Sequence, residues 1–351
     1  MGRFHPILFS LLLLSGHVCA QKADLLVVNK GKINGNLPGK LAFVHLASGK
    51  VLKQIPVGKE PHEVAVSADG RYAVVSNTGS YQQPGHTLSV IDLATQQEVH
   101  RMELGSLYNP HGLLALHGVF YFTAEGARAI GAYDPVKNQV VWLNGTGQDG
   151  THTLAATPDG KSLVATNRGS GTISIFQLRK PHRGPVPANG PEEEKLDPLA
   201  PGVWQEAIVT VGKNPEGLAI SPDGTQAWIG LKGGEGIAVV DLRTNNVAVF
   251  KVGEVEQLSR LKFTQDGRYL LGTNNNMDGE LVIVEVATRQ LVKKLALGTG
   301  AEAIFLEPDG RHALIGVTGK DQVAEIDLRT MTVSRRFDAG QGPDGMAWIG
   351  N

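Results

Sequence analysis

Ionisable side chains open most copies of a repeated segment, and their types could form a metal or ligand site. The opening position is occupied, in chain order, by His62, His111, His152, Glu216, Ser259, Glu302 and Asp344. Arg260 follows directly after the one member of this set that cannot ionise. Strand packing in a repeat does not require ionisable groups at such a position. We therefore treat it as the candidate functional site.

Two kinds of chemistry suit these residues. Neutral imidazoles and carboxylates are ligands for divalent transition metals, so His62, His111 and His152 could hold one Zn²⁺, Fe²⁺ or Mn²⁺ ion. Glu216 or Glu302 would then move protons while a lactone is hydrolysed or a group is eliminated. Alternatively, the same position recognises a small polar or anionic ligand without a metal. The sequence also allows a purely structural role in which these side chains bond neighbouring loops.

The repeat itself predicts the fold. Its clearest copies are PHEVAVSADG (61–70), THTLAATPDG (151–160), PEGLAISPDG (215–224) and AEAIFLEPDG (301–310). Each copy reads as an alternating strand, an Asp-Gly hairpin turn and three further short strands, with a period of roughly 42 residues. Four antiparallel strands per repeat are typical of a β-propeller blade. The chain has 44 glycines in 351 residues, in keeping with many tight turns.

The two ends of the repeat array predict a closed ring of seven blades. The segment 343–350 reads as a lone first strand, whereas 25–31, 41–49 and 51–58 read as second, third and fourth strands. Together they would complete one blade and leave no open sheet edge. Closure would gather the opening residues around one axis, where ligands of closed repeats commonly bind.

The same rim should receive the residues that end each second strand or follow it. Those expected to bind a ligand there are Asn29, Lys30, Asn77, Glu125, Asn167, Arg168, Lys232 and Asn274, together with Arg260 and Asp344.

The repeats resemble the YVTN family of β-propellers, also called YncE-like. The matching second strands are AVVSN (73–77), LVATN (163–167) and LLGTN (270–274), each followed by a third strand such as VIDLAT (90–95) or VVDLRT (239–244). The resemblance covers the chain from residue 21 onward and implies an exported or surface protein. Relatives of the same architecture include lactonases, a lyase and redox-cofactor subunits, so the resemblance is specific for the fold and not for the activity.

The first 20 residues read as a signal peptide. Arg3 precedes a short apolar run, and small residues around Cys19 predict cleavage after Ala20, which leaves 21–351 as one domain. The run is too short to span a bilayer. Cys19 is the only cysteine, so the exported chain would contain neither disulfide nor thiolate metal site. We expect a periplasmic or secreted protein.

Charge and composition limit the partners. With 33 basic and 34 acidic residues the net charge is −1, which disfavours nucleic acid and anionic membranes. A proline-rich insertion at 180–202 interrupts one blade and could contact a partner protein, so an interaction scaffold is a further alternative. The leading expectation is an axial rim that binds a small polar or anionic molecule.

Overall fold

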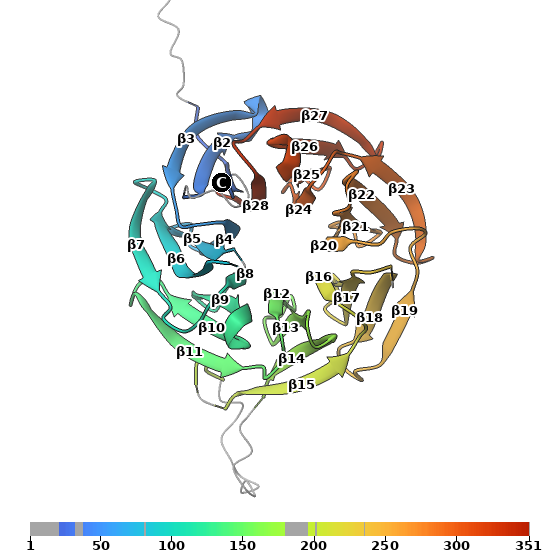
Figure 1. The fold of residues 1–351 in the computed structure, drawn as a ribbon, viewed down its shortest axis with the longest axis horizontal. Helices are drawn as coiled ribbons and strands as arrows, with labels where there is room; N and C mark the ends of the chain where they lie inside the picture. Colours follow the sequence, from blue (N-terminus) through green and yellow to red (C-terminus); the bar gives the residue numbers. More distant parts are fainter. Residues whose placement is uncertain are drawn as a thin grey trace, which may run out of the picture.

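The computed structural model describes residues 21–31, 38–80, 82–179, 196–200, 202–234 and 236–350. These residues form seven four-stranded antiparallel sheets arranged as blades around a central channel (Figure 1). The seven-bladed β-propeller predicted from the repeats is confirmed. The predicted signal peptide (1–20) and most of the insertion (180–195 and 201) lie outside the described residues.

Each blade has its first strand at the channel and its fourth at the outside of the ring, and we name a blade by its first strand. The first strands are β4 (Pro61–Val66), β8 (Pro110–Leu116), β12 (Thr151–Ala156), β16 (Pro215–Ile220), β20 (Leu258–Phe263), β24 (Ala301–Leu306) and β28 (Pro343–Trp348). The second strands are β5 (Tyr72–Gly79), β9 (Val119–Ala124), β13 (Ser162–Asn167), β17 (Gln226–Leu231), β21 (Tyr269–Asn274), β25 (His312–Val317) and β1 (Leu25–Asn29).

The outer half of each blade follows the same order. The third strands are β6 (Pro84–Asp92), β10 (Ala129–Asp134), β14 (Thr172–Leu178), β18 (Gly236–Asp241), β22 (Glu280–Glu285), β26 (Gln322–Asp327) and β2 (Lys40–His45). The fourth strands are β7 (Gln97–Glu103), β11 (Gln139–Gly145), β15 (Trp204–Thr210), β19 (Val247–Phe250), β23 (Gln290–Ala296), β27 (Thr332–Asp338) and β3 (Lys50–Pro56). Three short 3₁₀ turns complete the described structure: η1 (Leu46–Ser48), η2 (Glu125–Ala127) and η3 (Thr318–Lys320).

The ring closes as predicted. Strand β28 pairs antiparallel with β1, so the last described strand completes the sheet that β1, β2 and β3 begin. In Figure 1 the dark red β28 lies within the blue blade. The insertion joins β14 to β15, the third and fourth strands of the β12 blade. No helix among the described residues is long and apolar enough to cross a membrane.

The core lies between the blades. The described residues form seven apolar clusters, and each joins the facing surfaces of two neighbouring sheets. Each fully buried Val, Leu or Ile contributes about 1.5–3 kcal/mol relative to an exposed one. Because every sheet is covered on both faces, removal of one blade would expose two of these clusters.

A turn at the far end of the channel reverses each first strand. In the β4–β5 turn the Gly70 N–H donates to the Ser67 carbonyl (2.8 Å), and Gly70 has φ +68°, which glycine adopts without strain. The Ser67 N–H in turn donates to the Tyr72 carbonyl (2.8 Å). The loop therefore contains the four residues 68–71 between Ser67 and Tyr72, and it is longer than a two-residue Asp-Gly hairpin. The opening residues stand at the opposite end of the first strands.

Candidate functional site

The opening residues form one ring at the channel mouth, which we call the axial ring. Each is the second residue of its first strand: His62, His111, His152, Glu216, Ser259, Glu302 and Asp344. A register shift follows the first residue pair in all six blades from β4 to β24, and a shift also interrupts the β1–β28 pairing beside Asp344. Such irregularities re-aim side chains relative to a regular strand. They place the ring residues at the mouth.

Hydroxyl groups of the neighbouring blades fix the backbone of the ring. Thr123 Oγ1 accepts from the Gly112 N–H (2.8 Å) in its own blade and donates to the carbonyl of His152 (2.6 Å) in the next. Ser76 makes the same contact with the His111 carbonyl (2.9 Å), and Thr273 with the Glu302 carbonyl (2.7 Å). These hydroxyls lie toward the channel end of their second strands, Ser76 in β5, Thr123 in β9 and Thr273 in β21. They satisfy backbone groups that the irregular register leaves without ladder partners.

The three histidines form a stacked row along one side of the mouth. The ring centroids of His62 and His111 are 4.6 Å apart, and those of His111 and His152 are 3.9 Å apart. His111 is buried, and this burial, reinforced by His152 and His62, holds its pKa well below the ordinary value. His111 is therefore a neutral imidazole, and its Nδ1 is buried without a hydrogen-bond partner.

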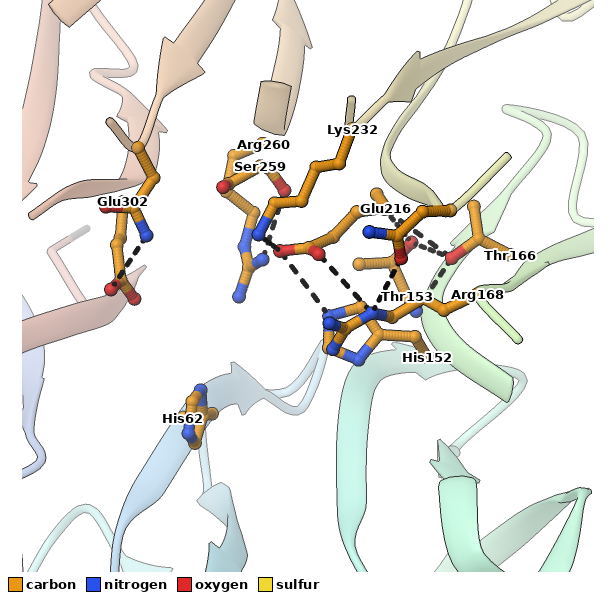
Figure 2. Close-up of polar contacts among 12 residues, drawn as sticks. His62, His152, Thr153, Thr166, Arg168, Glu216, Lys232, Ser259, Arg260 and Glu302 are labelled. Atoms are coloured by element: carbon orange, nitrogen blue, oxygen red, sulfur yellow. Dashed lines mark hydrogen bonds and ion pairs between the residues drawn. The ribbon is translucent and has the colours of Figure 1, made fainter. Parts of the chain in front are cut away.

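Glu216 lies at the end of this row and is held ionised by cations (Figure 2). Lys232 Nζ lies 2.8 Å from its Oε1 and Arg168 Nε lies 3.4 Å from its Oε2. His152 Nε2 lies 4.0 Å from Oε1. Burial alone would raise the pKa of Glu216, but His152, Arg168 and Lys232 outweigh it and lower the pKa to about 2.

A second charged cluster occupies the other side of the mouth. Lys30 Nζ lies 2.5 Å from Glu302 and 2.9 Å from Asp344, whose Oδ2 is also 3.2 Å from His62 Nδ1. Asp344 is fully buried. Burial opposes its ionisation, but Lys30 and His62 hold the pKa of Asp344 well below its ordinary range. Asn275 also donates to Glu302 (3.2 Å).

One group of side chains has the composition of a metal site. Donor atoms of His111, Glu125 and His152 lie within 4.8 Å of one another, and Glu125 contacts His152 Nδ1 directly. Two histidines and one glutamate are a ligand set that proteins use for zinc. The neutral, unpartnered imidazole of His111 fits that use. His62, predicted to be the third ligand, lies outside this group and faces Asp344.

Below the ring an ion pair bridges the channel. Arg260 Nη2 lies 2.8 Å from Glu63 Oε1. Strands β20 and β4, which carry them, are separated by two blades on one side and three on the other. This pair borders a cavity of about 330 Å³, whose lining also includes Lys262 and several aliphatic side chains. The Lys262 side chain stays exposed within the channel, but desolvation by the surrounding strands lowers its pKa, and the nearby Arg260 adds to this.

Several residues predicted to bind a ligand are engaged elsewhere. The Asn77 amide accepts from the Gly58 N–H and donates to Thr87 and Ser89. Asn167 and Asn274 make equivalent contacts within their own blades. Asn29 is buried, and its amide donates to the Val27 carbonyl (3.3 Å). These amides therefore hold strands and turns together.

The remaining predicted residues lie in the two charged clusters or the bridge below them. They are Lys30, Glu125, Arg168, Lys232, Arg260 and Asp344. Sequence reasoning missed Glu63, which stands one position after His62, and the hydroxyls of Ser76, Thr123 and Thr273. The recurrence of Ser or Thr directly before Asn in the second strands was the available signal for Ser76 and Thr273, whereas Thr123 precedes Ala124 and lacks that signal.

Comparison with solved structures identifies the same architecture in proteins of differing function. A proposed 6-phosphogluconolactonase from Bacteroides fragilis is 16% identical with a TM-score of 0.71, covering 94% of this chain and 99% of its own. The periplasmic gluconolactonase PpgL of Pseudomonas aeruginosa is 18% identical with a TM-score of 0.67, covering 93% and 99%. Hydrazine synthase of Kuenenia stuttgartiensis is 19% identical with a TM-score of 0.65, covering 82% and 89%.

These likenesses establish the fold alone, because the identities are low. No protein-family model matches the sequence, and no curated protein matches it.

Proposed function

We propose that the axial ring binds a small polar molecule that carries a carboxylate or another anionic group. The observation that carries this proposal is the position of Arg168 and Lys232 beside the row of imidazoles. The Arg168 side chain keeps 37% of its surface exposed although it contacts the buried Glu216. A guanidinium in this position can turn one edge toward a ligand while its other edge stays on the protein carboxylate.

The remaining polar groups favour a ligand with several hydroxyls. Carboxylates of Glu125 and Glu302 stay partly exposed at the mouth and accept hydrogen bonds, whereas Lys30 and Lys232 donate them. Acceptors and donors therefore lie together at the channel mouth. A hydroxy acid or its lactone presents the complementary pattern, because each hydroxyl both donates and accepts.

We also propose that the protein is an exported member of the YVTN group. The apolar run before Ala20 and the strings AVVSN, LVATN and LLGTN support this assignment. The periplasmic location of the gluconolactonase with a similar fold is consistent with it.

Ligand binding can be tested by calorimetry on the full chain with a panel of hydroxy acids and lactones, gluconate and gluconolactone among them. We expect Arg168→Ala to weaken binding of the best ligand at least tenfold. Arg101→Ala is the matched control, because Arg101 is similarly exposed and also pairs with a glutamate, but on the outer strand β7. The proposal fails if no panel member binds, or if Arg168→Ala and Arg101→Ala have equal effects.

A second candidate function is lactone hydrolysis assisted by a metal, and the His111–Glu125–His152 group favours it. A divalent ion held by these residues would act as a Lewis acid toward an ester carbonyl. Glu216 is a weak base because its pKa is about 2, so its role here is to hold Arg168 and Lys232 in place for the substrate's anionic group. Glu302 remains the carboxylate proposed to move a proton.

Metal analysis of untagged protein and lactone hydrolysis followed by alkali titration test this candidate. We expect hydrolysis to require added Zn²⁺ or Mn²⁺ and to fall at least a hundredfold in His111→Ala. Hydrolysis that survives both chelation and His111→Ala would contradict it while leaving the ligand-binding proposal standing.

A further inference from the structure

Four of the turns that follow the first strands share one hydrogen-bonding pattern. In the β4–β5 turn, Ser67 Oγ donates to Asp69 (2.6 Å) and accepts from the Tyr72 N–H (2.9 Å). Thr157, Ser221 and Thr264 occupy the same place in the β12, β16 and β20 blades, with contacts of 2.6 Å to the aspartate two positions later. A hydroxyl thus links the aspartate to the start of the second strand.

The β24–β25 turn keeps the backbone and changes the side chains. The Gly310 N–H donates to the Glu307 carbonyl (3.0 Å), as the corresponding glycine does in the other turns. Glu307 stands at the position that Ser or Thr occupies in the other four turns. His312 stands at the position that Tyr72 occupies in the β4–β5 turn. The aspartate, here Asp309, is retained. One turn has therefore exchanged a hydroxyl for two groups that can bind a metal.

These three side chains converge. His312 Nδ1 lies 2.7 Å from Asp309 Oδ2, and donor atoms of Glu307, Asp309 and His312 all lie within 4.8 Å of one another. Asp309 and His312 also border an open groove between this turn and the β20–β21 turn, so an ion could reach them from solvent.

A separate observation concerns the carboxylate of Glu307. Glu307 is 9% exposed, and its Oε1 is buried without a hydrogen-bond partner. The nearby Arg335 is engaged by Glu325, with Nη2 2.5 Å from its carboxylate. No ion pair among the described residues neutralises Glu307. A buried carboxylate oxygen without a partner is costly, and a bound cation would remove that cost.

We propose that Glu307, Asp309 and His312 bind a divalent transition-metal ion such as Zn²⁺ or Mn²⁺. One imidazole nitrogen with two carboxylates suits these ions better than Ca²⁺ or Mg²⁺, which prefer oxygen ligands alone. The site lies at the opposite end of β24 from Glu302, roughly 17 Å away at about 3.3 Å per residue. It is therefore separate from the axial ring, and its role is to hold the β24–β25 turn in one conformation.

Calorimetry with Zn²⁺ and with Mn²⁺ on chelator-stripped, untagged full chain tests the site. The informative variant is Glu307→Ser, which installs the side chain that Ser67 and Ser221 contribute to their turns and should preserve the fold. We expect it to weaken binding at the site at least tenfold and to abolish the rise in thermal midpoint that the metal causes at this site. His312→Tyr, which copies Tyr72, should do the same.

The two candidate metal sites are separated by a second pair of variants. His111→Ala should leave binding at the Glu307 site intact, and Glu307→Ser should leave any binding at the axial ring intact. The proposal is overturned if the wild type binds neither ion at 100-fold molar excess. It is equally overturned if Glu307→Ser and His312→Tyr both bind with wild-type affinity and stoichiometry. If Glu307→Ser misfolds, the result for His312→Tyr alone decides.

Discussion

The Arg260 guanidinium and the Glu63 carboxylate meet 2.8 Å apart, although the residues are 197 positions apart and stand on opposite sides of the channel. Two first strands that share no sheet are thereby tied across the axis. Both residues also line the cavity of about 330 Å³ in the channel.

Loss of either member of this pair should destabilise the ring. We expect Arg260→Met and Glu63→Gln each to reduce the free energy of unfolding by about 1–3 kcal/mol, because a charged hydrogen bond is lost in a partly buried place. The double variant should cost less than the sum, with a coupling of about 0.5–3 kcal/mol. Urea unfolding of the four proteins measures this, and strict additivity would show that the two residues do not interact.

Loss of Lys30 should destabilise the protein more than loss of Arg260 or Glu63, because Lys30 faces a carboxylate with no access to solvent. Lys30→Met leaves the Asp344 charge without its closest cation, and breaking such a buried pair costs about 3–5 kcal/mol. Adding Asp344→Asn should recover part of the loss. A double variant less stable than Lys30→Met alone would contradict this assignment.

Glu216 should contribute to stability in a pH-dependent way. Its pKa is lowered from 4.5 to about 2 in the folded protein, so the unfolded chain binds more protons between these values. The contribution, on the order of 3 kcal/mol, is present above about pH 4.5 and is lost as the pH falls toward 2. Unfolding of wild type and Glu216→Gln in urea from pH 3 to 7 measures it. A difference between the two proteins that stays constant over this range would contradict the assignment.

The hydroxyl contacts behind the ring make a further prediction. Thr123→Val keeps the shape of the side chain but leaves the Gly112 N–H and the His152 carbonyl without their partner. We expect a loss of about 1–3 kcal/mol in the free energy of unfolding, with Thr123→Ser restoring most of it. Thr210→Val, at an exposed position of β15, serves as control and should change stability by less than about 0.5 kcal/mol. Equal effects of Thr123→Val and Thr210→Val would exclude the proposed contact.

The sequence predicted the seven blades, their strand order and the closing β28–β1 pair, because hairpin turns and alternating strands are local signals. It also placed the ring residues correctly at the start of each first strand. It did not predict that Asn77, Asn167 and Asn274 turn into their own blades. These amides cap the loops that precede the first strands and contact the start of the third strands, which the alternation of the second strands does not reveal.

Contacts between side chains of different blades could not be predicted from the sequence either. The pairing of Arg260 with Glu63, and of His62 with Asp344, depends on the radius of the ring and on side-chain length. Glu125 joins His111 and His152 because η2 follows β9 directly and turns the glutamate toward the mouth. Repeat patterns carry no information about such distances.

The β28–β1 pair also has a consequence for synthesis. Strand β1 leaves the ribosome early, but its partner follows roughly 300 residues later, which takes about 15–60 s at ~5–20 residues per second. For that time one edge of the first sheet lacks its neighbour, and unpaired edges invite pairing with other chains. During this interval the nascent chain is most exposed to wrong pairing, and cellular factors that shield unpaired strands would act then.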